Sequence, residues 1–257
     1  MLYFCTRIVA RHHCGHRGIH KTLPPKWTND LLSEFADDAF RNMLATFVQK
    51  KPQFEILIQI DRLYFEIAKN LSHPENVLTP LFVFRSHSAF RTGCQLASGG
   101  QISESFCVLR ACLECALYCL HIYEHDSLGE VWLRRHDDKA SLKASRNEFS
   151  HSKVMTTLRN NDPKLCATIQ SLYERTIDFG GHPNERSITS SMVTETSETE
   201  VGVKQFYLHG DSLYLEHGLK SSAQIGLGGL YILRHVFRER FNVLDITSGL
   251  DQLRKNL

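Results

Sequence analysis

Two pairs of arginine and histidine residues have spacings at which they could act together in catalysis. Arg146 and His151 stand five residues apart in the run RNEFSH, and Arg175 and His182 stand seven apart in RTIDFGGH. A histidine can take up or release a proton near neutral pH, and an arginine can stabilise negative charge on a phosphate. All four residues are therefore candidate catalytic residues.

The expected helix geometry differs between the two pairs. On an intact helix, Arg146 and His151 would lie about 140° apart around the axis. Arg175 and His182 would share one face, although Gly180 and Gly181 interrupt the helix just before the histidine.

The stretch 101–126 predicts a buried helix with a single polar stripe, because it is apolar almost all round between residues 106 and 123. The stripe, called the polar seam below, consists of Ser103, Cys107, Arg110, Glu114, Tyr118, His121 and His125. Two interpretations are open. Arg110 and Glu114 form a buried structural ion pair that fixes the register of the helices. Alternatively, the seam from Arg110 through Tyr118 to His121 lines a cleft in which His121 moves protons.

Three cysteines, Cys112, Cys115 and Cys119, lie on the side of this helix opposite the polar seam. Their C-x2-C-x3-C spacing lacks an obvious fourth ligand, so we expect them to be small packing residues and predict no metal site. The eight cysteines do not form the pattern of a secreted disulfide framework. A reducing, cytoplasmic location is therefore expected.

The overall composition gives no electrostatic reason to expect nucleic acid or membrane binding. The 257 residues carry a formal charge of +2, with 42% hydrophobic and 23% charged residues. The longest apolar run contains Arg110 and Glu114, which argues against a membrane span. A basic stretch at 134–153 is interrupted by Asp137, Asp138 and Glu148. The sequence contains no phosphate-binding or dinucleotide motif, and no cofactor is expected.

Helical periodicity dominates the chain and predicts an all-α bundle of six or seven helices with one small β-hairpin near the C-terminus. We expect a disordered leader at 1–26 and a single helical domain at 27–257. Within it, helices are predicted at about 28–51, 53–71, 79–98, 101–126, 137–161, 163–179 and 219–242. A mobile loop is expected at 183–202 and the hairpin at 203–217, with its turn at 209–212.

The run from about Phe84 to Asn184, under half the chain, resembles bacterial helical-bundle families of the HEPN type. The resemblance depends on the helix pair FRSHSAFRTGCQLASGG and ISESFCVLRACLECALYCLHI, with its LR-x3-E pattern, and on the later YERTIDFGGHPN. It implies a HEPN-like core at about 79–184. Many HEPN proteins are metal-independent RNases of toxin–antitoxin or phage-defence systems. They carry an R-x4-6-H motif and complete a composite site by dimerising.

If that motif carries over, its arginine is Arg146 or Arg175 and its histidine is His151 or His182. The position of His182, late in the bundle and followed by Pro183, favours the second pair, while Asn147 after Arg146 favours the first. We select the second pair. Arg11 and His16 also satisfy the spacing within the expected leader.

These features predict a HEPN-like RNA-binding protein or metal-independent RNase that acts as a homodimer. The alternative is a non-catalytic helical interaction or oligomerisation protein, in which the polar seam is only structural. The sequence leaves open whether the protein is an enzyme.

Overall fold

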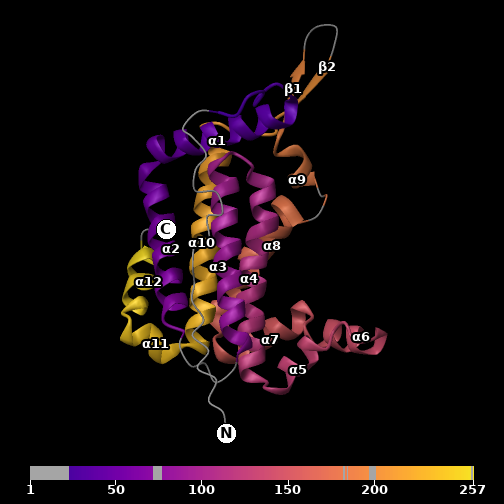
Figure 1. Ribbon diagram of the computed structural model, residues 1–257, viewed down its shortest axis with the longest axis vertical. Coiled ribbons are helices and arrows are strands. Elements are labelled where there is room, and N and C mark those ends of the chain that lie inside the picture. The colour runs from indigo at the N-terminus through magenta and orange to yellow at the C-terminus, as the bar shows by residue number, and fades with distance from the viewer. Residues whose placement is uncertain (1–22, 72–76, 182, 184, 197–200, 256) are drawn as a thin grey trace.

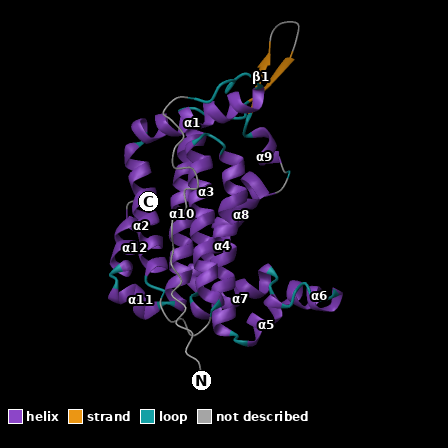
Figure 2. Ribbon diagram, viewed as in Figure 1, coloured by secondary structure: helices purple, strands orange, loops and turns teal. Residues whose placement is uncertain are grey.

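Long helices stand side by side in the structure, and the only strands among its described residues form one antiparallel hairpin (Figures 1 and 2). The computed structural model describes residues 23–71, 77–181, 183, 185–196, 201–255 and 257. The predicted all-α fold with a small β-hairpin is confirmed. Most of the expected leader lies outside the described residues, as do His182 and Asn184.

The N-terminal half consists of four long helices. These are α1 (Leu31–Gln49), α2 (Lys51–Lys69), α3 (Leu78–Ser98) and α4 (Ile102–Glu124). The carboxylate of Asp30 caps α1 by accepting hydrogen bonds from the backbone N–H groups of Leu32 and Ser33. Gly100 turns the chain between α3 and α4 with φ of 89°, a conformation that favours glycine. Because this turn is so short, α3 and α4 are antiparallel neighbours (Figure 1).

The middle of the chain contains a break that the sequence did not predict. It forms α5 (Ser127–Leu133), α6 (Lys139–Glu148), α7 (His151–Asn161), α8 (Pro163–Thr176) and the π-helix η1 (Ile177–Gly181). The single helix expected at 137–161 is therefore wrong, since Ser150 is extended and separates α6 from α7. The buried ring of Phe149 packs beside Tyr118 and His121 at this break. Tertiary packing thus ends α6 without a glycine or proline.

The C-terminal part corrects the position of the hairpin. It forms α9 (Glu185–Thr189), β1 (Met192–Thr196), β2 (Val201–Gln205), α10 (Leu213–Val236), α11 (Arg238–Val243) and α12 (Ile246–Lys255). β1 pairs with β2 so that Thr194 faces Val203. The hairpin predicted at 203–217 and the loop predicted at 183–202 are therefore misplaced. Ser212, assigned to the hairpin turn, caps α10, its hydroxyl accepting from the backbone N–H of Leu215.

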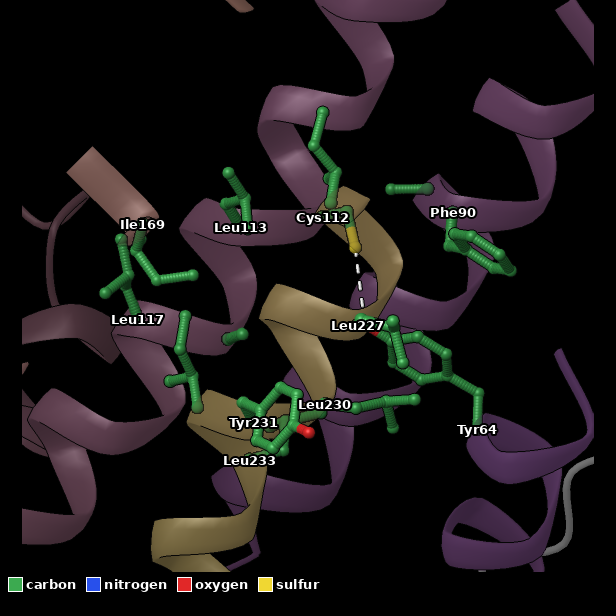
Figure 3. Close-up of a cluster of buried hydrophobic side chains, with 14 of the residues drawn as sticks. Tyr64, Phe90, Cys112, Leu113, Leu117, Ile169, Leu227, Leu230, Tyr231 and Leu233 are labelled. Carbon is green, nitrogen blue, oxygen red and sulfur yellow. Dashed lines mark hydrogen bonds between the residues drawn. The ribbon is translucent and has the colours of Figure 1, made fainter. Parts of the chain in front are cut away.

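The core centres on α4, which packs against α3 on one side and α10 on another (Figures 1 and 3). α3 approaches closely because Gly93 faces Leu109, and a Cβ atom built at Gly93 would lie 2.5 Å from the Leu109 side chain. Figure 3 shows Cys112 of α4 directed at Tyr64 of α2, beside the leucines of α10.

α4 is the one helix within the described ranges whose length and hydropathy would suffice for a membrane span. Of its 18-residue apolar window, 61% is buried inside the bundle. Such burial is typical of the core helix of a soluble protein.

Candidate functional site

The polar seam of α4 faces α7 and α8, and its central ion pair is about one-third exposed. Nε of Arg110 lies 3.4 Å from Oε1 of Glu114, with side-chain exposures of 31% and 38%. The pair forms as the spacing predicts, but the expectation that it is buried is wrong. Because water reaches both side chains, this pair contributes little to stability.

Tyr173 of α8 extends the seam across the interface between the two helices. Its hydroxyl donates a hydrogen bond of 3.0 Å to Oε1 of Glu114. Burial, and next the negative charge of Glu114, raise the pKa of Tyr173 to about 12. The phenol therefore remains protonated at neutral pH and acts as a hydrogen-bond donor.

His151, the first residue of α7, lies against the ring of Tyr173. The two rings are stacked, with centroids 3.9 Å apart and an interplanar angle of 19°. Nε2 of His151 is 3.2 Å from Oε1 of Gln170, whose amide nitrogen donates to Glu174 at 2.8 Å. Since a carboxylate only accepts, this network assigns the proton of the neutral ring to Nε2. Nδ1 is then the basic nitrogen of His151.

Tyr118 and His121, in the other half of the seam, bind the turn that precedes and positions His151. The Tyr118 hydroxyl donates to the carbonyl of Phe149 at 3.1 Å. His121 lies 3.2 Å through Nε2 from the carbonyl of Glu148 and 2.7 Å through Nδ1 from the hydroxyl of Thr157. His121 is buried, and burial, followed by the nearby His125, lowers its pKa. With both ring nitrogens engaged, His121 stabilises this turn, while its predicted proton-transfer role stays a prediction.

Arg146 lies on the exposed surface of α6, which projects away from the bundle (Figure 1). Together with Lys139 and Lys143 it forms a row of cations whose spacing places them on one face of the helix. All three are exposed, and none forms an ion pair with any residue that the structure describes. This row, called the α6 basic face below, leads to the turn before His151.

Arg175 lies on the opposite side of α8 from Tyr173. Its Nη1 donates hydrogen bonds to Oγ of Ser221 at 3.2 Å and to Oε1 of Gln224 at 2.6 Å, both on α10. Burial lowers its pKa. Arg175 therefore faces α10 and not the seam, and its predicted partner His182 lies outside the described residues.

Tyr173 and Gln170 are functional candidates that the sequence reasoning missed. Neither residue belongs to a motif or to a polar stripe that the sequence singles out. Their spacing of three residues places them on one side of α8, but the residue that they contact, His151, comes from another helix. Periodicity shows which residues share a face but gives no information on which helix covers that face.

The cysteines opposite the seam are packing residues. Cys112 and Cys119 are buried, and burial raises the pKa of the Cys112 and Cys119 thiols, that of Cys115 to about 12. Within the described part of the chain, no group of three or more His, Cys, Asp and Glu side chains could hold a metal ion.

Comparison with known proteins finds no match to any protein-family model, curated protein or solved structure. The HEPN resemblance therefore depends on the sequence motifs alone and stays a prediction.

Proposed function

We propose that the protein is a HEPN-like, cytoplasmic RNA-binding protein that cleaves RNA without a metal ion, with His151 as its proton-transfer group. The observation that carries this proposal is the contact of His151 with Tyr173. This contact joins the run from Arg146 to His151 to Glu114 and Arg110 of the seam. The cluster is partly exposed, so a substrate can reach it.

The α6 basic face supports RNA as the substrate. Lys139, Lys143 and Arg146 present three uncompensated charges along one side of a projecting helix. A row of this kind suits the phosphates of a single-stranded RNA, because proteins bind such strands largely through contacts between cations and phosphates. The strand would then lead from α6 toward His151.

The chemistry of His151 suits cleavage by the neighbouring ribose. Its Nδ1 would take the proton of the 2′-hydroxyl while the 2′-oxygen forms a bond to phosphorus. The bond from phosphorus to the 5′-oxygen breaks, and solvent supplies the proton that this oxygen needs. The products are a 2′,3′-cyclic phosphate and a free 5′-hydroxyl. Arg146 would stabilise the charge on the phosphate oxygens.

A cleavage assay with a short fluorescent single-stranded RNA in EDTA tests the proposal. We expect wild-type cleavage, and a loss of about 10²–10⁴-fold in His151→Gln, the range typical of a general acid or base. His136→Gln, which changes an exposed histidine between α5 and α6, is the matched control. An RNA with a 2′-deoxy substitution at the cut site should resist cleavage. Equal cleavage by wild type and His151→Gln would overturn the proposal.

Binding is measured separately by fluorescence anisotropy at several salt concentrations. Lys143→Gln and Arg146→Gln should each weaken RNA binding and reduce its salt dependence, since each removes about one phosphate contact. Lys220→Gln, an exposed lysine of α10, should change neither quantity. If the α6 variants bind like wild type, RNA does not follow α6.

A second candidate function, a non-catalytic oligomerisation protein, is favoured by the exposed apolar face of α1. Its exposed members are Phe40, Leu44, Phe47 and Val48, which are 50% to 73% accessible. The other side of α1 is held by polar contacts at the end of α3, where Thr46 donates to the carbonyl of Ser98 at 2.9 Å. α1 lies across the end of the bundle (Figure 1), so a partner can reach this face.

A second copy of the chain can cover this face. An antiparallel pair of α1 helices related by a two-fold axis would bury the four apolar side chains of each copy against those of the other. Light scattering should then give a dimer for the wild type and a monomer for Phe40→Ser/Leu44→Ser. A monomeric wild type would remove this alternative and would also contradict the predicted homodimer.

A further inference from the structure

A cavity of about 520 Å³ lies beside His121, but a larger one lies between α8 and α10, far from the seam side of α8. The larger cavity has a volume of about 750 Å³, within the range of roughly 300–1,000 Å³ typical of small-molecule sites. One wall is apolar and includes Leu165, Leu172 and Leu227. α12 contributes to its rim through Arg254.

Positive charge outnumbers negative charge on the cavity lining. Four cations, Lys164, Arg175, Arg234 and Arg254, line it together with Leu257, the last residue of the sequence, and a single acidic side chain, that of Asp162. This carboxylate is already engaged, since its Oδ1 caps α8 by accepting from the backbone N–H of Leu165 at 2.9 Å. Its Oδ2 lies 3.8 Å from Nε2 of His235.

Arg175 is the lining cation best placed to bind an anion. Its guanidinium is fixed by two neutral acceptors, Ser221 and Gln224, and within the described chain no carboxylate forms an ion pair with it. Neutral acceptors orient the group but leave its charge uncompensated. A half-buried guanidinium in that state has a strong affinity for an anion.

Tyr231 arranges two of the other cations. Its hydroxyl donates to Oδ1 of Asp251 at 3.0 Å, which fixes the ring. The guanidinium carbons of Arg234 and Arg254 lie 5.1 Å and 5.9 Å from the ring centroid, distances at which cation–π attraction holds them. Arg254 also has a weak, exposed ion pair with Asp251 at 3.9 Å. Arg234 has no ion pair with a described residue.

We infer that this cavity binds a phosphorylated small molecule of nucleotide size, with its phosphates at Arg175 and Arg234 and its apolar body against Leu165, Leu172 and Leu227. A single carboxylate ligand would satisfy one of these cations. A phosphate chain carries several negative charges and acceptor oxygens, so it matches several cations at once. The site is separate from His151, because Arg175 and Tyr173 face opposite sides of α8.

Isothermal titration of the full chain with ATP in EDTA tests the inference. We expect binding that is weakened about tenfold or more by Arg175→Gln, the effect typical of losing a charged hydrogen bond. Lys164→Gln, a surface change on the same lining, should weaken it less. Arg62→Gln, an exposed arginine of α2, should have no effect. Circular dichroism and thermal unfolding confirm that each variant is folded. If Arg175→Gln does not fold, Lys164→Gln still tests whether the cations of this lining bind ATP.

Three other ligands, adenosine, tripolyphosphate and single-stranded RNA, test which parts of ATP the cavity recognises. Adenosine should bind far more weakly than ATP, because it lacks the phosphates. Tripolyphosphate should also bind more weakly, because it lacks the apolar body. Single-stranded RNA should not displace ATP, and His151→Gln should bind ATP like wild type. No ATP binding, equal binding by Arg175→Gln, equal binding of adenosine or of tripolyphosphate, or displacement by RNA would each overturn the inference.

Discussion

α4 carries polar groups on two sides, and the surroundings of the two clusters differ. On the inner side, Cys112 meets Tyr64 and Ser86, and all three residues are fully buried. The Tyr64 hydroxyl lies 3.3 Å from Sγ of Cys112 and 3.2 Å from Oγ of Ser86, and Ser86 donates to the carbonyl of Cys112 at 2.9 Å. On the outer side, Arg110 and Glu114 meet Tyr173, which stacks on His151, and water reaches the cluster.

The difference is one of charge as well as exposure. Burial raises the pKa of Tyr64 and Cys112, so the inner cluster is neutral and its members satisfy one another. The outer cluster contains an arginine, a carboxylate and a histidine, which are tolerated because they remain hydrated. The inner cluster therefore determines how α2, α3 and α4 pack, while chemistry is expected at the outer one.

Truncating the inner tyrosine should have the largest effect on stability. Tyr64→Ala removes a fully buried aromatic ring, and such changes cost about 3–5 kcal/mol of unfolding free energy. Tyr173→Ala on the outer side should cost clearly less, because that residue is only partly buried. Urea unfolding of both variants measures the difference. An equal or greater loss in Tyr173→Ala would mean that the outer cluster is also a packing core.

Removing only the hydroxyl groups separates hydrogen bonding from packing. Tyr64→Phe should lower the unfolding free energy by about 1 kcal/mol, since Ser86 keeps its bond to the Cys112 carbonyl. Tyr173→Phe should cost less, because water can replace its hydroxyl beside Glu114. The same urea titrations measure both, with the wild type as reference. If Tyr64→Phe proved neutral, the inner hydrogen bonds would not contribute to the packing of α2 on α4.

The pH dependence of stability should report the buried histidine of the seam. Burial, and then His125, lower the pKa of folded His121 below the value near 6.5 that it has when unfolded. Below about pH 6.5 the unfolded chain therefore binds a proton that the folded chain excludes, and the unfolding free energy falls as the pH drops. Above about pH 6.5 neither state binds this proton, so His121 no longer lowers the unfolding free energy.

The contribution of His121 is obtained by difference, because other half-buried histidines act in the same direction. Burial also lowers the pKa of His209, His217 and His235. His121→Asn should lose less stability than wild type between pH 7.5 and pH 5.5, an interval chosen to span the reference value of about 6.5. Identical slopes for the two proteins would mean that His121 is not shielded from protons.

Helix faces were predictable from the sequence because they depend on local periodicity. The stripe of polar residues on α4 lies where its spacing predicts. Cap residues were also informative: Asp162 and Pro163 begin α8 as expected. These features require only neighbours within one or two turns.

Contacts between helices were not predictable in the same way. The break at Ser150 depends on Phe149 packing beside Tyr118 and His121, which are separated from it by more than two dozen residues. The stacking of His151 on Tyr173 joins two further helices. The selected pair of Arg175 and His182 assumed a single face of α8, whereas the structure shows that Tyr173, two residues before Arg175, faces the seam instead.

The smallest expected effect concerns the ion pair at the centre of the outer cluster, and it decides between the two interpretations of the seam. A double-mutant cycle with Arg110→Met and Glu114→Gln measures the coupling free energy of the pair in urea unfolding. Since both side chains are about one-third exposed, the coupling should be only about 0.2–0.5 kcal/mol and should shrink in high salt. A buried pair that fixed the helix register would leave an uncompensated charge after either single change, at a cost of about 3–5 kcal/mol. A coupling above about 2 kcal/mol would therefore restore the structural interpretation, while a small one leaves Arg110 and Glu114 free to orient Tyr173 against His151.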